Sequence, residues 1–263
     1  MPRFAANLTM MFTEHPFPER FEHAALQGFS LVEYLFPYVF EPAVLAGKLR
    51  QYGLSQVLFN LPPGNWEAGE RGMACIPGRE KEFAASVDTA VVYAKALGCP
   101  LVHAMAGNRP AGAEEARLRD TYLDNIGRAA RRLAEEGLAL CLEPINRWSM
   151  PEYFLRTQEQ AVEVIEALAL PNVKLQFDFF HCQMQEGNVT HTLRRFFSHI
   201  GHCQLAGVPD RHEPDTGELY YPYLFEVLDA LGYAGAIGCE YNPAGDTAAG
   251  LGWIRGYGVV PRG

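Results

Sequence analysis

An apolar run ends abruptly in a carboxylate between residues 138 and 146, where the chain reads Leu138-Ala139-Leu140-Cys141-Leu142-Glu143-Pro144-Ile145-Asn146. A short continuous apolar run is typical of a parallel strand, because helices cover both faces of such a sheet. An acid at its last residue is costly to bury unless the strand end opens onto a metal ion or a catalytic pocket. The pattern recurs at three later strand ends, at Asp178, Gln204 and Glu240. These four oxygen-bearing side chains need a common explanation.

Strands and helices are predicted to alternate along the whole sequence. Apolar runs predict strands at 4–10, 31–36, 54–60, 100–105, 138–143, 173–178, 202–206 and 236–241. Helical periodicity falls between them, at 18–28, 41–52, 80–97, 114–136, 157–168, 188–197 and 221–231, with a short last helix near Thr247. Strict alternation implies parallel strands with right-handed crossovers. Eight such units in 263 residues predict an α/β fold, a single (β/α)₈ TIM barrel whose one domain spans residues 1–263.

Composition limits the partners of the protein. The formal net charge of −9 argues against nucleic acid or an anionic membrane as the main partner, because both attract basic surfaces. No apolar stretch approaches the ~20 residues that span a bilayer, and the N-terminus has no signal-peptide pattern. We therefore expect a cytoplasmic protein, and the sequence leaves a homo-oligomer open.

The cysteines are expected to be reduced and structural. None of the six forms a CxxC pair, and Cys141, Cys203 and Cys239 fall inside predicted buried strands. Cys182 lies beside the proposed site and is the one thiol whose reactivity is of interest.

Adjacent strands carry the four oxygen-bearing residues Glu143, Asp178, Gln204 and Glu240. The active site of a TIM barrel lies at the carboxyl ends of its strands, and side chains there alternate between the axis and the helices. If all four face the axis, they converge, and the carboxylates would raise one another's pKa. A divalent cation removes that repulsion, and an all-oxygen set favours Mg²⁺ or Mn²⁺ over zinc. For any one residue alone, a salt-bridged or solvent-facing acid is the better interpretation.

A metal ion held by oxygens predicts isomerase chemistry. Such an ion can bind two adjacent oxygens of an α-hydroxy ketone, polarise the carbonyl and stabilise an enediolate. Glu143 and Glu240 would flank the substrate from opposite sides. One could remove a proton from one carbon while the other delivers a proton to the next. This is an isomerisation of the aldose–ketose type.

Several segments also resemble a known family over nearly the whole chain. They are Met1-Pro2-Arg3-Phe4-Ala5-Ala6-Asn7-Leu8, Phe59-Asn60-Leu61-Pro62-Pro63-Gly64, Glu143-Pro144-Ile145-Asn146, Arg211-His212-Glu213-Pro214-Asp215-Thr216-Gly217-Glu218, Gly238-Cys239-Glu240-Tyr241 and Gly250-Leu251-Gly252-Trp253. In these segments the chain is similar to the hydroxypyruvate isomerase family of xylose isomerase-like barrels, which includes 2-oxo-tetronate isomerases. The resemblance implies that Glu143 and Glu240 transfer the protons, and that both hold the metal together with Asp178 and Gln204.

The resemblance leaves the length of the substrate open. The leading hypothesis is the interconversion of hydroxypyruvate and 2-hydroxy-3-oxopropanoate (tartronate semialdehyde). The alternative is a four-carbon 2-oxo-tetronate, because the loop at 146–151 departs from the Thr-Arg-Asp sequence common in relatives and borders the substrate. A zinc endonuclease for abasic DNA would need more strand-end histidines and a basic face. A non-catalytic sugar-acid binder is a further alternative.

Two residues are candidates for binding a small sugar-acid substrate from the loops. A histidine three residues after the strand-six aspartate contacts substrate in related ketose epimerases, which implies this role for His181; the alternative is a hydrogen bond to loop backbone. The planar guanidinium of Arg211 suits a substrate carboxylate. Its alternative is an ion pair with Glu213 or Asp215.

Three polar residues at other strand ends complete the candidates. Asn60 and His103, which follow strands three and four, could hydrogen-bond substrate hydroxyls or orient the glutamates. For His103, satisfying buried loop carbonyls is the better explanation. Glu33 faces the same rim from strand two, but we do not expect it to be a metal ligand.

Overall fold

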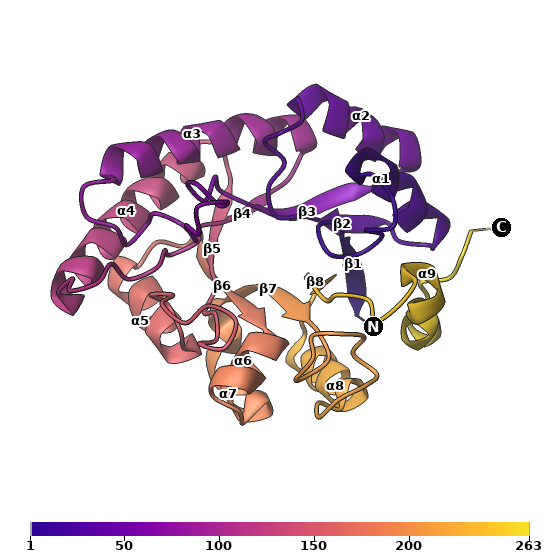
Figure 1. Ribbon diagram of the computed structural model, residues 1–263. Helices are drawn as coiled ribbons and strands as arrows, with labels where there is room; N and C mark the ends of the chain where they lie inside the picture. The colour runs from indigo at the N-terminus through magenta and orange to yellow at the C-terminus, as the bar shows by residue number, and fades with distance from the viewer. Residues whose placement is uncertain (1, 263) are drawn as a thin grey trace.

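In a computed structural model, which describes residues 2–262, parallel strands close into a barrel inside a layer of helices (Figure 1). Met1 and Gly263, the ends of the predicted domain, lie outside the described residues. Each strand pairs with the next in sequence, and the last pairs with the first. The predicted (β/α)₈ barrel is therefore confirmed.

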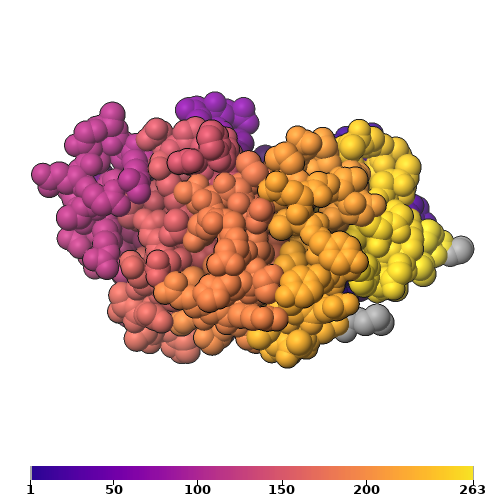
Figure 2. Space-filling view, turned by 90° about the horizontal axis from the view of Figure 1, so that it is seen from below, coloured from indigo at the N-terminus to yellow at the C-terminus, as the bar shows by residue number. Residues whose placement is uncertain are grey.

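The strands of the barrel are β1 (Arg3–Asn7), β2 (Leu31–Glu33), β3 (Ser55–Asn60), β4 (Leu101–His103), β5 (Ala139–Leu142), β6 (Val173–Asp178), β7 (Ile200–Leu205) and β8 (Ala236–Cys239). The helices are α1 (Phe17–Leu26), α2 (Pro42–Tyr52), α3 (Glu80–Leu97), α4 (Glu115–Ala134), α5 (Gln158–Leu168), α6 (Phe179–Gln185), α7 (Val189–Phe196), α8 (Tyr221–Leu231) and α9 (Thr247–Gly250), with 3₁₀ helices η1 (Phe197–His199) and η2 (Leu251–Tyr257). Segments follow one another in sequence order across the surface seen from below (Figure 2).

Several strands are shorter than the apolar runs predict. Pairing in β1 stops at Asn7, because the backbone turns there and the amides of Met10 and Met11 donate to the Asn7 carbonyl. The runs 31–36 and 236–241 likewise continue past the paired residues of β2 and β8. The apolar residues beyond the paired positions are buried or partly buried in the loops that follow the strands, and periodicity alone does not distinguish such residues from strand residues.

One helix was not predicted. The chain continues from β6 directly into α6, because the Asp178 side chain caps this helix. Its Oδ1 atom accepts hydrogen bonds from the backbone amides of Phe180, at 2.7 Å, and His181, at 3.4 Å. An aspartate at this position is a strong N-cap, so a local signal was present in the sequence. Thr157 caps α5 in a similar way, because its side chain accepts a hydrogen bond from the backbone amide of Gln160.

Most of the hydrophobic core lies between the strands and the helices. Two smaller clusters are made of strand residues that alternate with the core residues, and they fill the barrel itself. Their members are Ala5, Leu31 and Ala236 in one and Leu58, Leu101 and Cys141 in the other. Among the described residues, no helix has the length and apolar character needed to cross a membrane.

Candidate metal centre and active site

The four oxygen-bearing residues predicted from the sequence all lie at the carboxyl ends of their strands and are buried. Glu143 and Glu240 directly follow β5 and β8. Asp178 is the last residue of β6 and is paired in register with Gln204 on β7. The alternation along each strand turns these side chains towards the axis, because Cys141 on β5 and Ala236 on β8 already lie in the interior clusters.

Three of these acids meet at one point. Glu143, Asp178, Glu240 and His181 each offer one possible ligand atom, and these atoms all lie within 4.8 Å of one another. Glu143 Oε1 and Asp178 Oδ2 are buried and have no hydrogen-bond partner in the described part of the chain. Buried carboxylate oxygens require a partner, so the three carboxylates fit a hard divalent cation.

The electrostatics of the cluster agree with this interpretation. Burial and then the neighbouring carboxylates of Glu240 and Asp178 raise the pKa of Glu143 well above its usual value. Burial also raises the pKa of Glu240 to about 8, against the lowering effect of Arg211. The pKa of Asp178 is raised for the same reason. Ionising these acids together is therefore costly, and a bound cation would remove that cost.

The raised pKa values predict an unusual pH dependence of stability. With divalent ions removed by a chelator, the folded protein retains protons that the unfolded chain has released, so its free energy of unfolding should fall between pH 7 and 8. Below pH 6.5, the buried histidines His103 and His181, whose pKa values are lowered, act in the opposite direction. Urea denaturation at pH 7.0, 7.5 and 8.0 measures the slope. The free energy of unfolding of the Glu240→Gln variant should fall less steeply with pH. A wild-type free energy of unfolding that rises from pH 7 to 8 would contradict the raised pKa values.

His181 is oriented by a residue that the sequence analysis did not single out. Asn146 Oδ1 accepts from the backbone amides of Trp148 and Ser149, so its Nδ2 faces His181 Nδ1, at 2.6 Å. Because Nδ1 is an acceptor there, the proton of the neutral ring lies on Nε2, 3.6 Å from Asp178 Oδ2. His181 can thus donate a hydrogen bond into the site. Asn146 ends the Glu-Pro-Ile-Asn segment, and its place in that segment was the feature of the sequence that could have indicated a role in the site.

Arg211 reaches back from the loop after β7 into the cluster. Its Nη2 atom lies 2.6 Å from Glu240 Oε2 and 3.8 Å from Asp178 Oδ2. Its guanidinium also lies over the ring of Phe180, 5.0 Å from the centroid. The alternative ion pairs with Glu213 or Asp215 do not form in the described structure. Arg211 has a backbone φ of 59°, in the left-handed region.

His103 and Asn60 are neighbours at the ends of β4 and β3. His103 is fully buried, and its Nδ1 atom lies 3.6 Å from Glu143 Oε2. Burial, and then His202, lowers the pKa of His103 to about 3, so the ring is neutral. Neither ring nitrogen has a hydrogen-bond partner among the described residues, which leaves the ring free to contact a substrate hydroxyl. Asn60 is nearly buried beside it.

Gln204 lies between the cluster and the barrel interior. Its Nε2 atom donates to Glu33 Oε1 at 2.8 Å, and its Oε1 atom accepts from Gln176 Nε2 at 2.6 Å. The oxygen therefore points away from Glu33. Its predicted role as a metal ligand stays a prediction. Glu33 faces the barrel interior and accepts this hydrogen bond from Gln204.

Cys182 is not suited to nucleophilic chemistry. Its side chain is fully buried, and burial raises the pKa of its thiol well above the usual value. Reactive thiols are exposed and have a lowered pKa. All six cysteines are free and buried, as expected of structural thiols.

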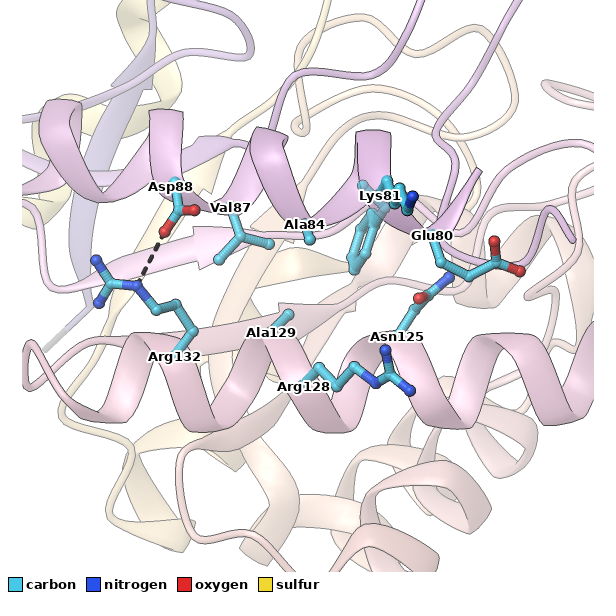
Figure 3. Close-up of a pocket in the computed structure, with 10 residues that line it drawn as sticks. Glu80, Lys81, Ala84, Val87, Asp88, Asn125, Arg128, Ala129 and Arg132 are labelled. Atoms are coloured by element: carbon cyan, nitrogen blue, oxygen red, sulfur yellow. Dashed lines mark hydrogen bonds and ion pairs between the residues drawn. The ribbon is translucent and has the colours of Figure 1, made fainter. Parts of the chain in front are cut away.

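A concave region lies outside the barrel, between α3 and α4 (Figure 3). Charged side chains from both helices line it, and Arg132 Nε pairs with Asp88 Oδ1 at 2.9 Å across the groove. Its lining contains none of the strand-end residues described above. The groove belongs to the outer helical layer and plays no part in the site.

The fold and the acidic strand ends define a class of protein. The sequence model described as a xylose isomerase-like TIM barrel matches residues 21–257. The chain therefore belongs to the xylose isomerase-like TIM barrels, within which it groups with the hydroxypyruvate and 2-oxo-tetronate isomerases. The resemblance expected from the sequence segments is confirmed.

Individual relatives match over almost their full length. A 2-oxo-tetronate isomerase of Cupriavidus necator is 52% identical over 257 residues, covering 98% of this chain and 99% of the relative. The hydroxypyruvate isomerase of Escherichia coli K12 is 44% identical, covering 98% and 100%. A crystal structure from Brucella melitensis, described as an AP endonuclease of family 2, superposes with a TM-score of 0.96 at 50% identity, covering 98% and 99%.

Proposed function

We propose that the protein isomerises a small 2-oxo sugar acid, interconverting hydroxypyruvate and 2-hydroxy-3-oxopropanoate with the help of Mg²⁺ or Mn²⁺. The observation that carries the proposal is the convergence of Glu143, Asp178 and Glu240, with two of their oxygens buried and without a hydrogen-bond partner in residues 2–262. Relatives named for both hydroxypyruvate and 2-oxo-tetronate isomerisation support the reaction type and leave a four-carbon 2-oxo-tetronate as the alternative substrate.

Glu143, Asp178, Gln204 and Glu240 would hold the ion. When bound, it would supply polarisation of the substrate carbonyl, which makes the α-proton acidic. The protein supplies the proton transfer: one of Glu143 and Glu240 removes the α-proton, and the other delivers a proton to the adjacent carbon. The hydroxyl proton moves to the former carbonyl oxygen, and proton exchange with water restores both carboxyls. Both carboxyls are buried, which brings the pKa of Glu240, about 8, into the range that a general acid–base needs near neutral pH.

The remaining polar residues would bind the substrate. His181 presents its Nε2 proton into the site, and His103 and Asn60 lie on the opposite side of Glu143's strand end. Arg211 is the only arginine that ion-pairs with the cluster in the described residues, and it would bind the substrate carboxylate. Such a fork-shaped donor suits a planar carboxylate.

A parallel assay tests the proposal. Hydroxypyruvate and the 2-oxo-tetronates are offered to the purified protein with chelator, with Mg²⁺ and with Mn²⁺. Turnover that needs the ion and is highest for one acid supports the proposal and identifies the chain length. Absence of turnover on every acid would refute it. Abasic DNA is included because of the name of the Brucella structure, although the net charge of −9 opposes DNA binding.

Arg211→Lys should weaken the use of acidic substrates selectively. Lysine retains the charge but loses the bidentate geometry, so we expect kcat/KM for hydroxypyruvate to fall about 10- to 100-fold, mainly through KM. An uncharged α-hydroxy ketone serves as the control substrate, because it offers no carboxylate. Equal losses for both substrates would show that Arg211 acts only through Glu240.

A cytoplasmic location stays a prediction from the sequence, which leaves a homo-oligomer open.

A further inference from the structure

A second polar layer lies inside the barrel, one step below the strand-end acids. Gln176 and His202 precede Asp178 and Gln204 by two residues, so they face the same interior. Glu33 joins them from β2, and it is 1% exposed. An unpaired charge at such a place is costly, so its partners are informative.

The Glu33 carboxylate contacts several strands across the closed barrel. Its Oε2 atom accepts from His202 Nε2 at 2.7 Å, and its Oε1 atom accepts from Gln204 Nε2 at 2.8 Å and from Asn7 Nδ2 at 3.0 Å. On β8, Gly238 leaves the space that the carboxylate occupies, since a Cβ atom there would lie 2.2 Å from Glu33 Oε1. Gly238 does not have a positive φ, so this close approach is the physical reason for a glycine.

This arrangement determines which way the neighbouring amides point. A carboxylate only accepts hydrogen bonds, so Gln204 must turn its NH₂ group towards Glu33 and its carbonyl oxygen away. That oxygen accepts from Gln176, whose own Oε1 atom then remains a buried acceptor without a partner in residues 2–262. In the same way, Asn7 turns its NH₂ group to Glu33 and reaches Glu240 Oε1 at 3.5 Å.

We propose that Glu33 is a positioning residue for the metal centre. Its carboxylate fixes the amide orientation of Gln204 and aims Asn7 at Glu240, and so sets the affinity of the strand-end cluster for a divalent ion. The proposal rests on the metal-dependent function proposed above. It gives Glu33 a role without making it a ligand.

Two variants disturb the carboxylate by independent routes. Glu33→Gln keeps the shape but can donate as well as accept, so Gln204 is no longer held in one orientation. Gly238→Ala keeps the charge but displaces the carboxylate. Loss of an outer partner of a metal ligand typically costs 10- to 100-fold in affinity, and we expect Mn²⁺ to bind each variant about that much more weakly. Glu33→Asp retains an acceptor-only group and should recover part of the affinity.

Matched controls separate positioning from general damage to the barrel. Gln56→Met removes another buried amide, whose Nε2 atom donates to the Leu58 carbonyl and contacts none of the strand-end acids in the described structure. Gly47→Ala adds a methyl group where nothing lies within 4 Å. Both should bind Mn²⁺ like the wild type. Melting temperatures of the chelated proteins confirm that each variant is folded.

Calorimetric titration with Mn²⁺ alone distinguishes the outcomes. Weaker binding by folded Glu33→Gln and Gly238→Ala, with unchanged controls, supports the proposal. Wild-type affinity in either folded variant would overturn the positioning role while leaving the proposed function intact. If Glu33→Gln does not fold, Gly238→Ala decides. A wild-type protein that binds no Mn²⁺ would overturn the metal site itself.

Discussion

Replacing Glu143 or Glu240 by glutamine is expected to lower kcat for the preferred 2-oxo acid by about 10²- to 10⁴-fold, the usual contribution of a general acid–base. Glutamine retains the shape of the side chain and one carbonyl oxygen, but it cannot exchange a proton. Both residues are buried at the barrel mouth and close to one another, so water cannot readily replace them. Initial rates with saturating Mg²⁺ or Mn²⁺ measure the effect.

Retained metal binding in these variants is the essential companion measurement. If turnover is lost while the ion still binds, the two carboxyls act on protons as well as on the ion. Glu226→Gln, on the exposed face of α8, is the matched control and should behave as wild type. Unaltered turnover in both Glu143→Gln and Glu240→Gln would reject the isomerase mechanism. The double variant should lose little more than the worse single one, because the two residues act as a unit.

Removing the metal should abolish turnover altogether, and Asp178→Asn should prevent its recovery. Asparagine retains an oxygen that can cap α6 by accepting from Phe180 and His181, so the local fold should survive. It removes the charge, and we expect the affinity for Mn²⁺ to fall by at least about 100-fold, the upper end of the cost of losing an outer partner.

Dialysis against chelator followed by titration with Mg²⁺ or Mn²⁺ tests this expectation. Wild-type activity should return with the ion, while Asp178→Asn should remain inactive at concentrations that saturate the wild type. Circular dichroism and a thermal melt establish whether the variant keeps the secondary-structure content and the stability of the wild type. Full activity of the wild type in chelator would show that the carboxyl cluster does its chemistry without a metal.

The barrel and its acidic strand ends could be predicted because both are local patterns. An apolar run that stops at Glu143 or Asp178 indicates a buried strand whose last residue faces a polar site. Eight alternating strand–helix units can form only a few folds, of which the closed barrel is one. The ends of the strands could not be predicted, because apolar loop residues over the barrel mouth continue the same pattern. The capping role of Asp178 could also be predicted from the sequence, because aspartate is a common N-cap, but a metal ligand was the role predicted for it.

The side-chain contacts around the site could not be predicted from patterns among neighbouring residues in the sequence. Asn146 and His181 are 35 residues apart and meet only because the loop after β5 folds onto α6. Arg211 pairs with Glu240 and Asp178, since its loop turns back over the barrel. Glu213 and Asp215 lie closer to Arg211 in sequence and were the alternative ion-pair partners. Arg211 nevertheless pairs with acids that are distant in sequence.

The amino-acid sequence by itself determined the architecture, the reaction class and the residue types at the strand ends. Buried strands and their alternation with helices produce patterns among residues that are close in sequence. Only the tertiary structure decided the partners of Glu33, since it meets His202 and Gln204 from β2, 169 and 171 residues away. Closure of the barrel brings these strands together, and hydrogen-bond polarity then determines how their side chains face. No local pattern carries that information.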